Sequence, residues 1–305
     1  MHKITIDDIE SIVDFSISDS LKQVITTNEI SYVYLSSTER DNVILQIINQ
    51  LNETLEKTGP HRHGQWERSW KSNVDLFKND NNFDSLIPNY FNKSNVGRWK
   101  GEFVNGLGKH FDYKLLNIFV DCYLHKYVGT SYENLFEFGC GSAHNLVRFG
   151  NFNKNINLIG LDWATSSQEI IKEIQSLNLN TKIKGYNFDL YSPSYKLDIP
   201  VNSAIFTCDS LEQLGENYKL FVDFLLNKKP SICINFEPIT ELLDENKLLD
   251  KLSILYSKKR NYLTGYLTYL EKLEKENKIK ILVKKRLPYG SLYLEPCAII
   301  IWKVL

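Results

Sequence analysis

The chain of 305 residues lacks the features of a membrane or secreted protein. It contains no run of about 18 apolar residues, the length that a bilayer-spanning helix needs. Residues 1–16 carry Asp7, Asp8, Glu10 and Asp14, where a secretory signal would need a basic start and an unbroken apolar stretch. We therefore expect a cytoplasmic protein with no membrane partner.

An excess of charge of one sign is also missing. Lys and Arg together number 36 and Asp and Glu together 37, which gives a net charge of −1. A protein so close to neutrality has no overall field that attracts phosphate backbones. Nucleic acid is therefore disfavoured as a partner, and a small molecule is favoured.

Closely spaced cysteines and a complete set of metal ligands are absent too. The five cysteines are odd in number, widely spaced and free of any C-x-x-C pair, which favours reduced thiols. His61 and His63 form an H-x-H that can supply two metal ligands, but no third ligand is recognisable near them. We predict no metal site.

From residue 131 onward, short apolar runs alternate with helical patterns. Such alternation predicts a parallel sheet with helices on both faces. The last two apolar runs, Ile279 to Val283 and Cys297 to Trp302, have only a loop between them, so they should pair antiparallel at the sheet edge. The expected fold is α/β, a doubly wound seven-stranded sheet that is mostly parallel with an antiparallel C-terminal strand. A helical insertion is expected at about 240–277.

Residues 1–130 are expected to form a helical cap without strands. Within it, residues 60–104 are too aromatic for a disordered linker and too irregular for one regular element. Because the sheet already has helices for both faces, we expect this segment to cover the carboxyl ends of the strands as a lid. Its large aromatic residues are Trp66, Trp70, Tyr90, Phe91 and Trp99.

A glycine-containing loop supplies the main chemical signal. Gly139, Cys140 and Gly141 follow an apolar strand and precede a helix, where glycine permits a sharp turn and close approach of a ligand. Asp162 ends the next strand, where a carboxylate can accept hydrogen bonds from both ribose hydroxyls. The pair predicts a nucleoside-binding site.

Two ligands compete for this loop, a nicotinamide dinucleotide and S-adenosylmethionine. A dinucleotide loop has G-x-G-x-x-G, but this chain has His144 at the sixth position. Glu137 stands two residues before the first glycine, where its carboxylate would repel a pyrophosphate and attract a sulfonium or an ammonium group. The residues therefore favour S-adenosylmethionine.

The run Glu137-x-Gly139-x-Gly141-x-Ala143 resembles the first motif of class I S-adenosylmethionine-dependent methyltransferases, and the resemblance extends over residues 133–305. It implies that Asp162 binds the ribose, that Asp189 binds the adenine amino group and that Trp163 lies against the adenine face. The chain also resembles uncharacterised methyltransferases of bacterial polysaccharide clusters. That resemblance implies a sugar or nucleotide-sugar acceptor.

Residues for the methyl acceptor are expected at the carboxyl ends of later strands. Glu212 and Glu237 are candidates for holding an acceptor hydroxyl or amine, and His144 for a general base or a packing role. Arg98, in the cap, can pair with the cofactor carboxylate. No Asn/Asp-Pro-Pro-Tyr tetrad follows the fourth strand, which again disfavours nucleic-acid bases.

These patterns predict a methyltransferase that uses S-adenosylmethionine and acts on an oxygen or nitrogen atom of a small polar molecule. Two alternatives stay open: a non-catalytic protein that binds S-adenosylmethionine as a partner, and a nicotinamide-dependent oxidoreductase. The sequence leaves the acceptor and the oligomeric state undetermined.

Overall fold

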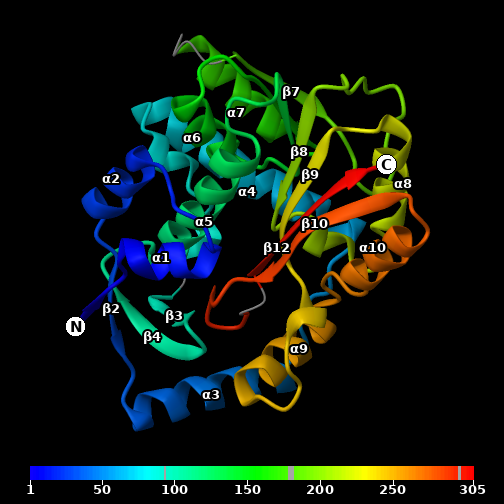
Figure 1. The fold of residues 1–305 in the computed structure, drawn as a ribbon. Helices are drawn as coiled ribbons and strands as arrows, with labels where there is room; N and C mark the ends of the chain where they lie inside the picture. The colour runs from blue at the N-terminus through cyan, green and yellow to red at the C-terminus, as the bar shows by residue number, and fades with distance from the viewer. Residues whose placement is uncertain (93, 178–181, 295–296) are drawn as a thin grey trace.

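A seven-stranded sheet forms the centre of the molecule in the computed structural model, which describes residues 1–92, 94–177, 182–294 and 297–305 (Figure 1). Its strand order is β10-β12-β9-β8-β5-β6-β7. The five parallel strands are β5 (Asn134–Phe138), β6 (Asn157–Asp162), β7 (Lys182–Asn187), β8 (Ser203–Cys208) and β9 (Ile232–Pro238). The predicted doubly wound sheet is confirmed.

The C-terminal strands form the antiparallel edge of this sheet, as predicted. Strand β12 (Cys297–Val304) runs antiparallel to β9, and β10 (Ile279–Arg286) runs antiparallel to β12. In β12, residues Ala298 to Trp302 are all fully buried, because the strand lies between two neighbours and under helices on both faces.

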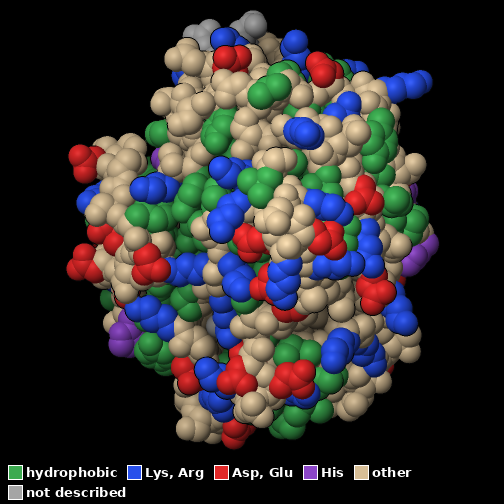
Figure 2. Space-filling model, turned by 45° about the vertical axis from the view of Figure 1, so that its right-hand side comes forward, with side chains coloured by type: hydrophobic (Ala, Val, Ile, Leu, Met, Phe, Trp, Pro, Cys, Tyr) green, Lys and Arg blue, Asp and Glu red, His purple; other side chains and the backbone are tan. Residues whose placement is uncertain are grey.

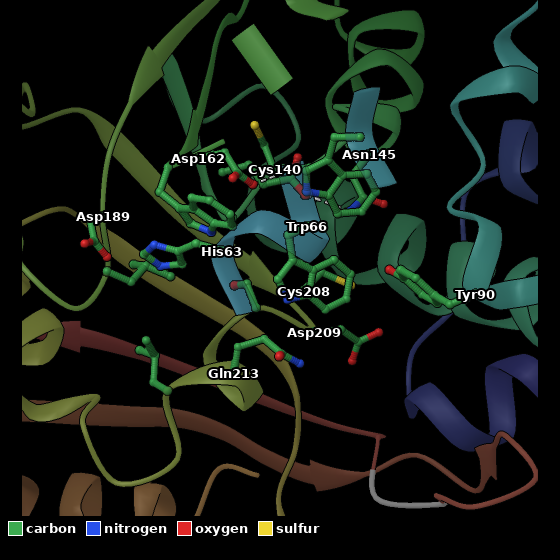
Figure 3. A pocket seen from close by; sticks show the side chains of 18 of the residues that line it. His63, Trp66, Tyr90, Cys140, Asn145, Asp162, Asp189, Cys208, Asp209 and Gln213 are labelled. Carbon is green, nitrogen blue, oxygen red and sulfur yellow. Dashed lines mark hydrogen bonds between the residues drawn. The ribbon is translucent and has the colours of Figure 1, made fainter. Parts of the chain in front are cut away.

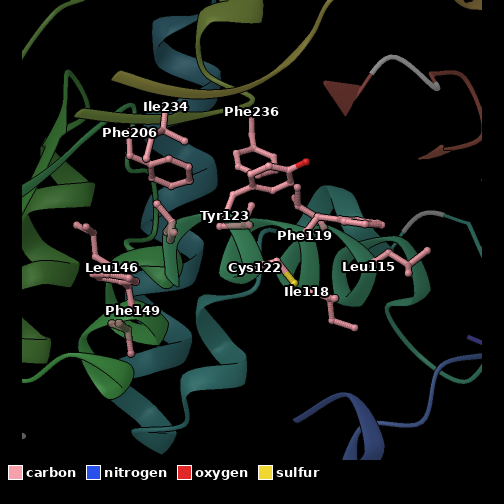
Figure 4. Close-up of a cluster of buried hydrophobic side chains, with 14 of the residues drawn as sticks. Leu115, Ile118, Phe119, Cys122, Tyr123, Leu146, Phe149, Phe206, Ile234 and Phe236 are labelled. Carbon is pink, nitrogen blue, oxygen red and sulfur yellow. The ribbon is translucent and has the colours of Figure 1, made fainter. Parts of the chain in front are cut away.

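Helices cover both faces of the sheet. One face is covered by α5 (Phe111–Tyr127), α6 (His144–Phe152) and α7 (Thr165–Ser176), and the other by α8 (Lys219–Lys228) and α10 (Tyr266–Lys275). Figure 4 shows Phe119 and Tyr123 of α5 facing Phe236 of β9. Each such buried aromatic side chain contributes on the order of 2–3 kcal/mol to folding.

The chain leaves β5 toward β6 and β7 on one side and returns to β8 and β9 on the other. Strands β5 and β8 are neighbours, so the connections that follow them diverge in opposite directions. In doubly wound folds this divergence opens a crevice at the carboxyl ends of the two strands. The glycine loop follows β5 and therefore lies at this crevice.

The prediction that the N-terminal region has no strands is wrong. A second, antiparallel sheet has the order β1-β2-β4-β3-β11, where β1 is His2–Lys3, β2 Ser31–Tyr34, β4 Glu102–Leu107, β3 Val96–Trp99 and β11 Tyr289–Gly290. Lys100 and Gly101 make the turn between β3 and β4 with φ of 50° and 84°. Two left-handed residues suit a tight hairpin, but lysine is an uncommon choice for the first, so the sequence gives no clear turn signal.

The N-terminal region is not a separate unit. Strand β11 comes from the connection between β10 and β12, and α5 packs on the main sheet although its residues fall within the predicted cap. The remaining helices are α1 (Ile6–Val13), α2 (Asp19–Thr27), α3 (Ser37–Asn52), α4 (His63–Asp80) and α9 (Leu248–Arg260). Short 3-10 turns occur at Pro60–Arg62, Phe83–Leu86, Asn89–Asn92, Leu211–Leu214 and Thr240–Leu242.

Helix α4 is fixed to α7. The carboxylate of Glu67 accepts hydrogen bonds from the backbone N–H groups of Thr165, at 2.8 Å, and Ser166, at 3.0 Å, and so caps the N-terminus of α7. Lys71 and Lys78 of α4 add ion pairs with Glu169 and Glu173 of α7. This anchoring brings the start of α4 to the carboxyl ends of the strands.

The surface carries charges of both signs. On the face in Figure 2, basic and acidic side chains are interspersed and no broad field of one sign is visible. Exposed ion pairs such as Lys284 with Glu271 and Lys3 with Glu29 are examples. Within the described ranges, no helix is both long and apolar enough to cross a membrane.

Candidate active site

The loop after β5 is built on residues with left-handed backbone. Gly139, Gly141 and Ala143 have φ of 73°, 51° and 59°. The N–H groups of Gly139 and Cys140 both donate to the carbonyl of Leu161 at the end of β6, at 2.7 and 3.1 Å. A side chain at Gly139 would meet Ser210 Cβ at 2.3 Å, so glycine is required there by space as well as by conformation.

Asp162 joins this loop to the next one. One carboxylate oxygen accepts a hydrogen bond from the N–H of Gly141 and the other from the N–H of Ala164, each at 2.9 Å. Burial raises the pKa of Asp162 to about 6, although both hydrogen bonds act in the opposite direction. The carboxylate is thereby held in one orientation, and each oxygen keeps a second lone pair for a ligand.

Glu137 is a buried acid with one unsatisfied oxygen. Its side chain is 1% exposed, and Oε1 accepts a hydrogen bond from Asn145 Nδ2 at 2.7 Å. Arg148 donates to Asn145 Oδ1 at 2.9 Å, which turns the amide N–H of Asn145 toward Glu137. Among the described residues, Oε2 of Glu137 has no partner. Burial raises the pKa of Glu137 to about 8.

These groups line one cavity of about 880 Å³, which we call the first cavity (Figure 3). Its floor comes from the glycine loop, Glu137 and Asp162, and its cover from α4 and the residues that follow it. The aromatic residues of its cover are Trp66, Trp70, Tyr90 and Phe91, whereas Trp99 is 1% exposed and packs in the core instead.

The two residues expected around an adenine also line the first cavity. Trp163 follows Asp162, and its ring is stacked on His63 with centroids 3.9 Å apart. Asp189 accepts a hydrogen bond from the N–H of Tyr191 at 2.9 Å, which fixes the carboxylate at the cavity edge. In Figure 3, His63 and Asp189 lie on the same side of the cavity.

The H-x-H pair is not arranged for a metal. His63 lines the first cavity, while His61 is exposed and does not line it. Where the structure describes the chain, no group of three His, Cys, Asp or Glu side chains is positioned to hold a metal ion.

A second cavity, of about 1710 Å³, adjoins the first. Its walls come from the start of α4, the start of α5, the turn after β8, α9 and the connection between β10 and β12. The residues that line both cavities are Trp66, Tyr90, Phe91, Leu116, Asp209 and Gln213. A molecule in the second cavity would therefore meet a ligand in the first across this boundary.

Glu212 and Glu237 have different positions. Glu212 lines the second cavity, and its pKa is raised well above the usual value by burial and by the charges of Asp209 and Glu237. Glu237 lines neither cavity and is fully buried. Its carboxylate accepts hydrogen bonds from the N–H groups of Ser210, Leu211 and Glu212 at 3.1–3.2 Å. Glu237 thus positions the turn after β8 and does not face an acceptor.

His144 is unsuited to the role of general base. It lines the first cavity, and its Nδ1 lies 3.1 Å from Ser142 Oγ. Burial, together with the charge of Arg148, lowers the pKa of His144 to about 3. The imidazole is therefore neutral at physiological pH and too weakly basic to take a proton efficiently.

The structure places Arg98 away from both cavities, so its predicted contact with a cofactor carboxylate is wrong. The side chain is fully buried and its guanidinium donates to the Leu249 carbonyl, Ser253 Oγ and the Leu292 carbonyl. These acceptors belong to α9 and to the segment after β11. Arg98 thus ties three separate parts of the chain together.

Two acids that the sequence analysis did not select lie at the boundary of the cavities. Asp209 lines both, in a left-handed conformation with φ of 51°, and Asp112, in the first turn of α5, lines the second. Burial raises the pKa of Asp112 to about 6, and burial with the charge of Asp112 raises that of Asp209 to about 7. The sequence does carry a signal for Asp209, because it directly follows β8 and so stands at the carboxyl end of a strand, as Glu212 nearly does.

No family model and no curated protein matches this chain. Solved structures with a similar fold include the small RNA methyltransferase HEN1, at 17% identity and a TM-score of 0.44, covering 61% of this chain and 24% of that chain. A second is PigF with SAH, at 13% identity and a TM-score of 0.49, covering 86% and 69%. A third is the [4+2]-cyclase SpnF, at 13% identity and a TM-score of 0.49, covering 76% and 97%.

The aligned part of this chain thus spans about a quarter of the HEN1 chain, and nearly all of SpnF. At such identities a likeness concerns the fold and does not transfer a function. The function of this protein has to be inferred from the residues of its own two cavities.

Proposed function

We propose that the protein is a methyltransferase that uses S-adenosylmethionine and methylates a nitrogen or oxygen atom of a small polar molecule. The observation that carries this proposal is the unsatisfied oxygen of Glu137, a buried acid that lines the same cavity as Asp162. A buried carboxylate without a partner favours a cationic ligand. Asp162 at the end of the neighbouring strand favours a ribose on that ligand.

The residues present fit S-adenosylmethionine. Glu137 would attract its ammonium group, Asp162 would accept from the ribose hydroxyls, and Trp163 and Asp189 would hold the adenine. When bound, this cofactor supplies an electrophilic methyl group on a sulfonium. Trp66, Trp70 and Tyr90 cover the cavity and limit the access of water.

The acceptor would occupy the second cavity, because that cavity meets the first at Asp209. Asp209 is the best-placed proton acceptor: it lines both cavities and its raised pKa of about 7 suits a general base at neutral pH. Glu212 would contact the acceptor from the turn after β8, and Glu237 would keep that turn in position.

The cavity gives little support to a nucleotide-sugar acceptor. A nucleoside diphosphate needs an excess of cationic groups, but four carboxylates line the second cavity against the two guanidinium groups of Arg62 and Arg260. The same acids disfavour a nucleic-acid backbone. A sugar without phosphate fits these acids, because carboxylates accept hydrogen bonds from hydroxyl groups.

The test is a mass-spectrometric search for a gain of one methyl group when the purified protein and S-adenosylmethionine are incubated with pools of small metabolites. Calorimetry with S-adenosylhomocysteine, NAD and NADP accompanies it. Binding of S-adenosylhomocysteine with no methylated product would favour the non-catalytic alternative. Comparable binding of NAD would favour the oxidoreductase and contradict the proposal.

A further inference from the structure

The second cavity contains more acidic than basic side chains. Four carboxylates line it, from Glu56, Asp112, Asp209 and Glu212, against two guanidinium groups, from Arg62 and Arg260. Whether the excess negative charge is already neutralised depends on which groups the two arginines contact.

Arg62 is paired with an acid away from Asp112, and Arg260 lies over the ring of Tyr262, 5.4 Å from its centroid. Arg62 Nε lies 3.4 Å from Glu56 Oε2, and Arg62 Nη1 donates to Gln213 Oε1 at 2.7 Å. The charge of Arg260 acts on Glu212, whose pKa it lowers against the larger effect of burial and the neighbouring carboxylates. Within the described ranges, no Lys or Arg side chain makes an ion pair with Asp112 or Asp209.

Asp112 and Asp209 line the same cavity, and neither forms an ion pair with a described Lys or Arg side chain. The charge of Asp112 contributes to the raised pKa of Asp209. The backbone N–H of Tyr113 donates to Asp112, and no described side chain donates to Asp209. Two partly buried carboxylates with so few donors favour a positively charged ligand between them.

Aromatic rings form much of the remaining wall. Tyr256 and Tyr293 are stacked with centroids 4.9 Å apart, and Tyr262 and Tyr289 line the same cavity. Trp66, at the boundary, has a buried indole N–H without an acceptor among the described residues. Aromatic faces attract organic cations by their quadrupole, so acids and rings here select the same class of ligand.

We propose that the second cavity binds an organic amine and that this amine is the methyl acceptor. The inference rests on the proposed function and names its substrate class. Asp112 and Asp209 bind the ammonium form, and Asp209 then accepts one proton from it. The lone pair so released forms the new N–C bond as the methyl–sulfur bond breaks. The products are a thioether and a methylated ammonium ion, and Asp209 later returns its proton to water.

A substitution of Asp112 tests acceptor binding separately from cofactor binding, because Asp112 lines the second cavity only. Asp209 lines both cavities. The experiment compares a series of primary amines of increasing length, including phenethylamine, with the alcohols in which a hydroxyl replaces the ammonium group. Dissociation constants are measured at pH 7.5 on the full chain, with and without saturating S-adenosylhomocysteine. The variants are Asp112→Asn and, as a control that removes one exposed acid elsewhere, Asp198→Asn.

We expect at least one amine to bind roughly tenfold more tightly than its alcohol, a factor that corresponds to one favourable charge contact. Asp112→Asn should abolish that preference while the affinity for S-adenosylhomocysteine stays unchanged, and Asp198→Asn should change neither. Equal binding of amines and alcohols, no binding of any amine, or a preference that survives Asp112→Asn would overturn the inference. Failure of S-adenosylhomocysteine to bind would instead contradict the proposed function, since the amine comparison is also made without it.

Discussion

Asp162 connects the glycine loop to the loop before α7 through hydrogen bonds to Gly141 and Ala164. Asp162→Ala should weaken the binding of S-adenosylhomocysteine by roughly 1.5–3 kcal/mol, the scale of lost hydrogen bonds to a charged group. Calorimetry measures the affinity, and a thermal melt identifies any general loss of structure. An unchanged affinity would remove Asp162 from the ribose role.

At Gly141, the side chain of Trp70 from α4 lies close to the loop. A Cβ there would meet Trp70 Cζ2 at 2.7 Å, and φ is +51°. Gly141→Val should abolish binding of S-adenosylhomocysteine because the new side chain enters the first cavity. Gly101→Val is the matched control: Gly101 also has positive φ, at +84°, but no atom lies within 4 Å of its Cβ. It should lower stability and leave binding intact. Retained binding in Gly141→Val would place the ligand elsewhere.

Residues that reach the first cavity because of their place on a strand could be located from the sequence. Glu137, Gly139 and Asp162 are examples, since each has a fixed distance in sequence from the end of β5 or β6. The position of Arg98 could not be predicted, because the three acceptors of its guanidinium lie about 150–190 residues further along the chain. The same limit applies to Asp112, which reaches the site only because α5 packs against β9 and β11.

At the scale of elements, α4 combines two functions that can be separated. Glu67 caps α7 and anchors the helix, whereas Trp66 and Trp70 cover the first cavity. Binding of S-adenosylhomocysteine should slow hydrogen exchange in residues 63–70 more than in β3 and β4, because only the former contact the cavity. Exchange followed by mass spectrometry checks this expectation. Equal exchange with and without ligand would mean that α4 does not act as a lid.

The sequence predicted the strands of the main sheet and missed all the strands of the second sheet. The buried strands of the main sheet stand out because each is an apolar run between polar segments. Strands β1 and β11 have two residues each, too few for any alternation to be visible. They exist because β2 and β3 offer them free edges, which is a property of the folded chain.

At the scale of the whole molecule, several buried acids have raised pKa values without a ligand. Burial raises the pKa of Glu137 and of Glu237 to about 8 and that of Asp209 to about 7. The folded protein therefore keeps protons that the unfolded chain has released above pH 5. Stability from these groups is present at low pH and is lost as pH rises through 7 and 8.

Two buried histidines have lowered pKa values, and they affect the free energy of unfolding only at lower pH. Burial lowers the pKa of His125 to about 4 and of His144 to about 3, so they cost stability as pH falls below about 6.5. Between pH 6.5 and 8 the acids dominate. The melting temperature of the ligand-free protein should therefore fall over this interval, as scanning fluorimetry can measure. A melting temperature that rises from pH 6.5 to 8 would show that these acids are ionised in the folded protein.

The central claim is that Glu137 and the glycine loop bind a cationic nucleoside. The most direct test is the affinity for S-adenosylhomocysteine, which carries the ammonium group, between pH 6.5 and 8 for the wild type and Glu137→Gln. Because Glu137 has to lose its proton to attract an ammonium ion, the wild-type affinity should rise with pH across this interval. Glu137→Gln should bind more weakly at pH 8 and show a flatter dependence. A wild-type affinity that falls with pH, or a variant that binds as tightly at pH 8, would contradict the account.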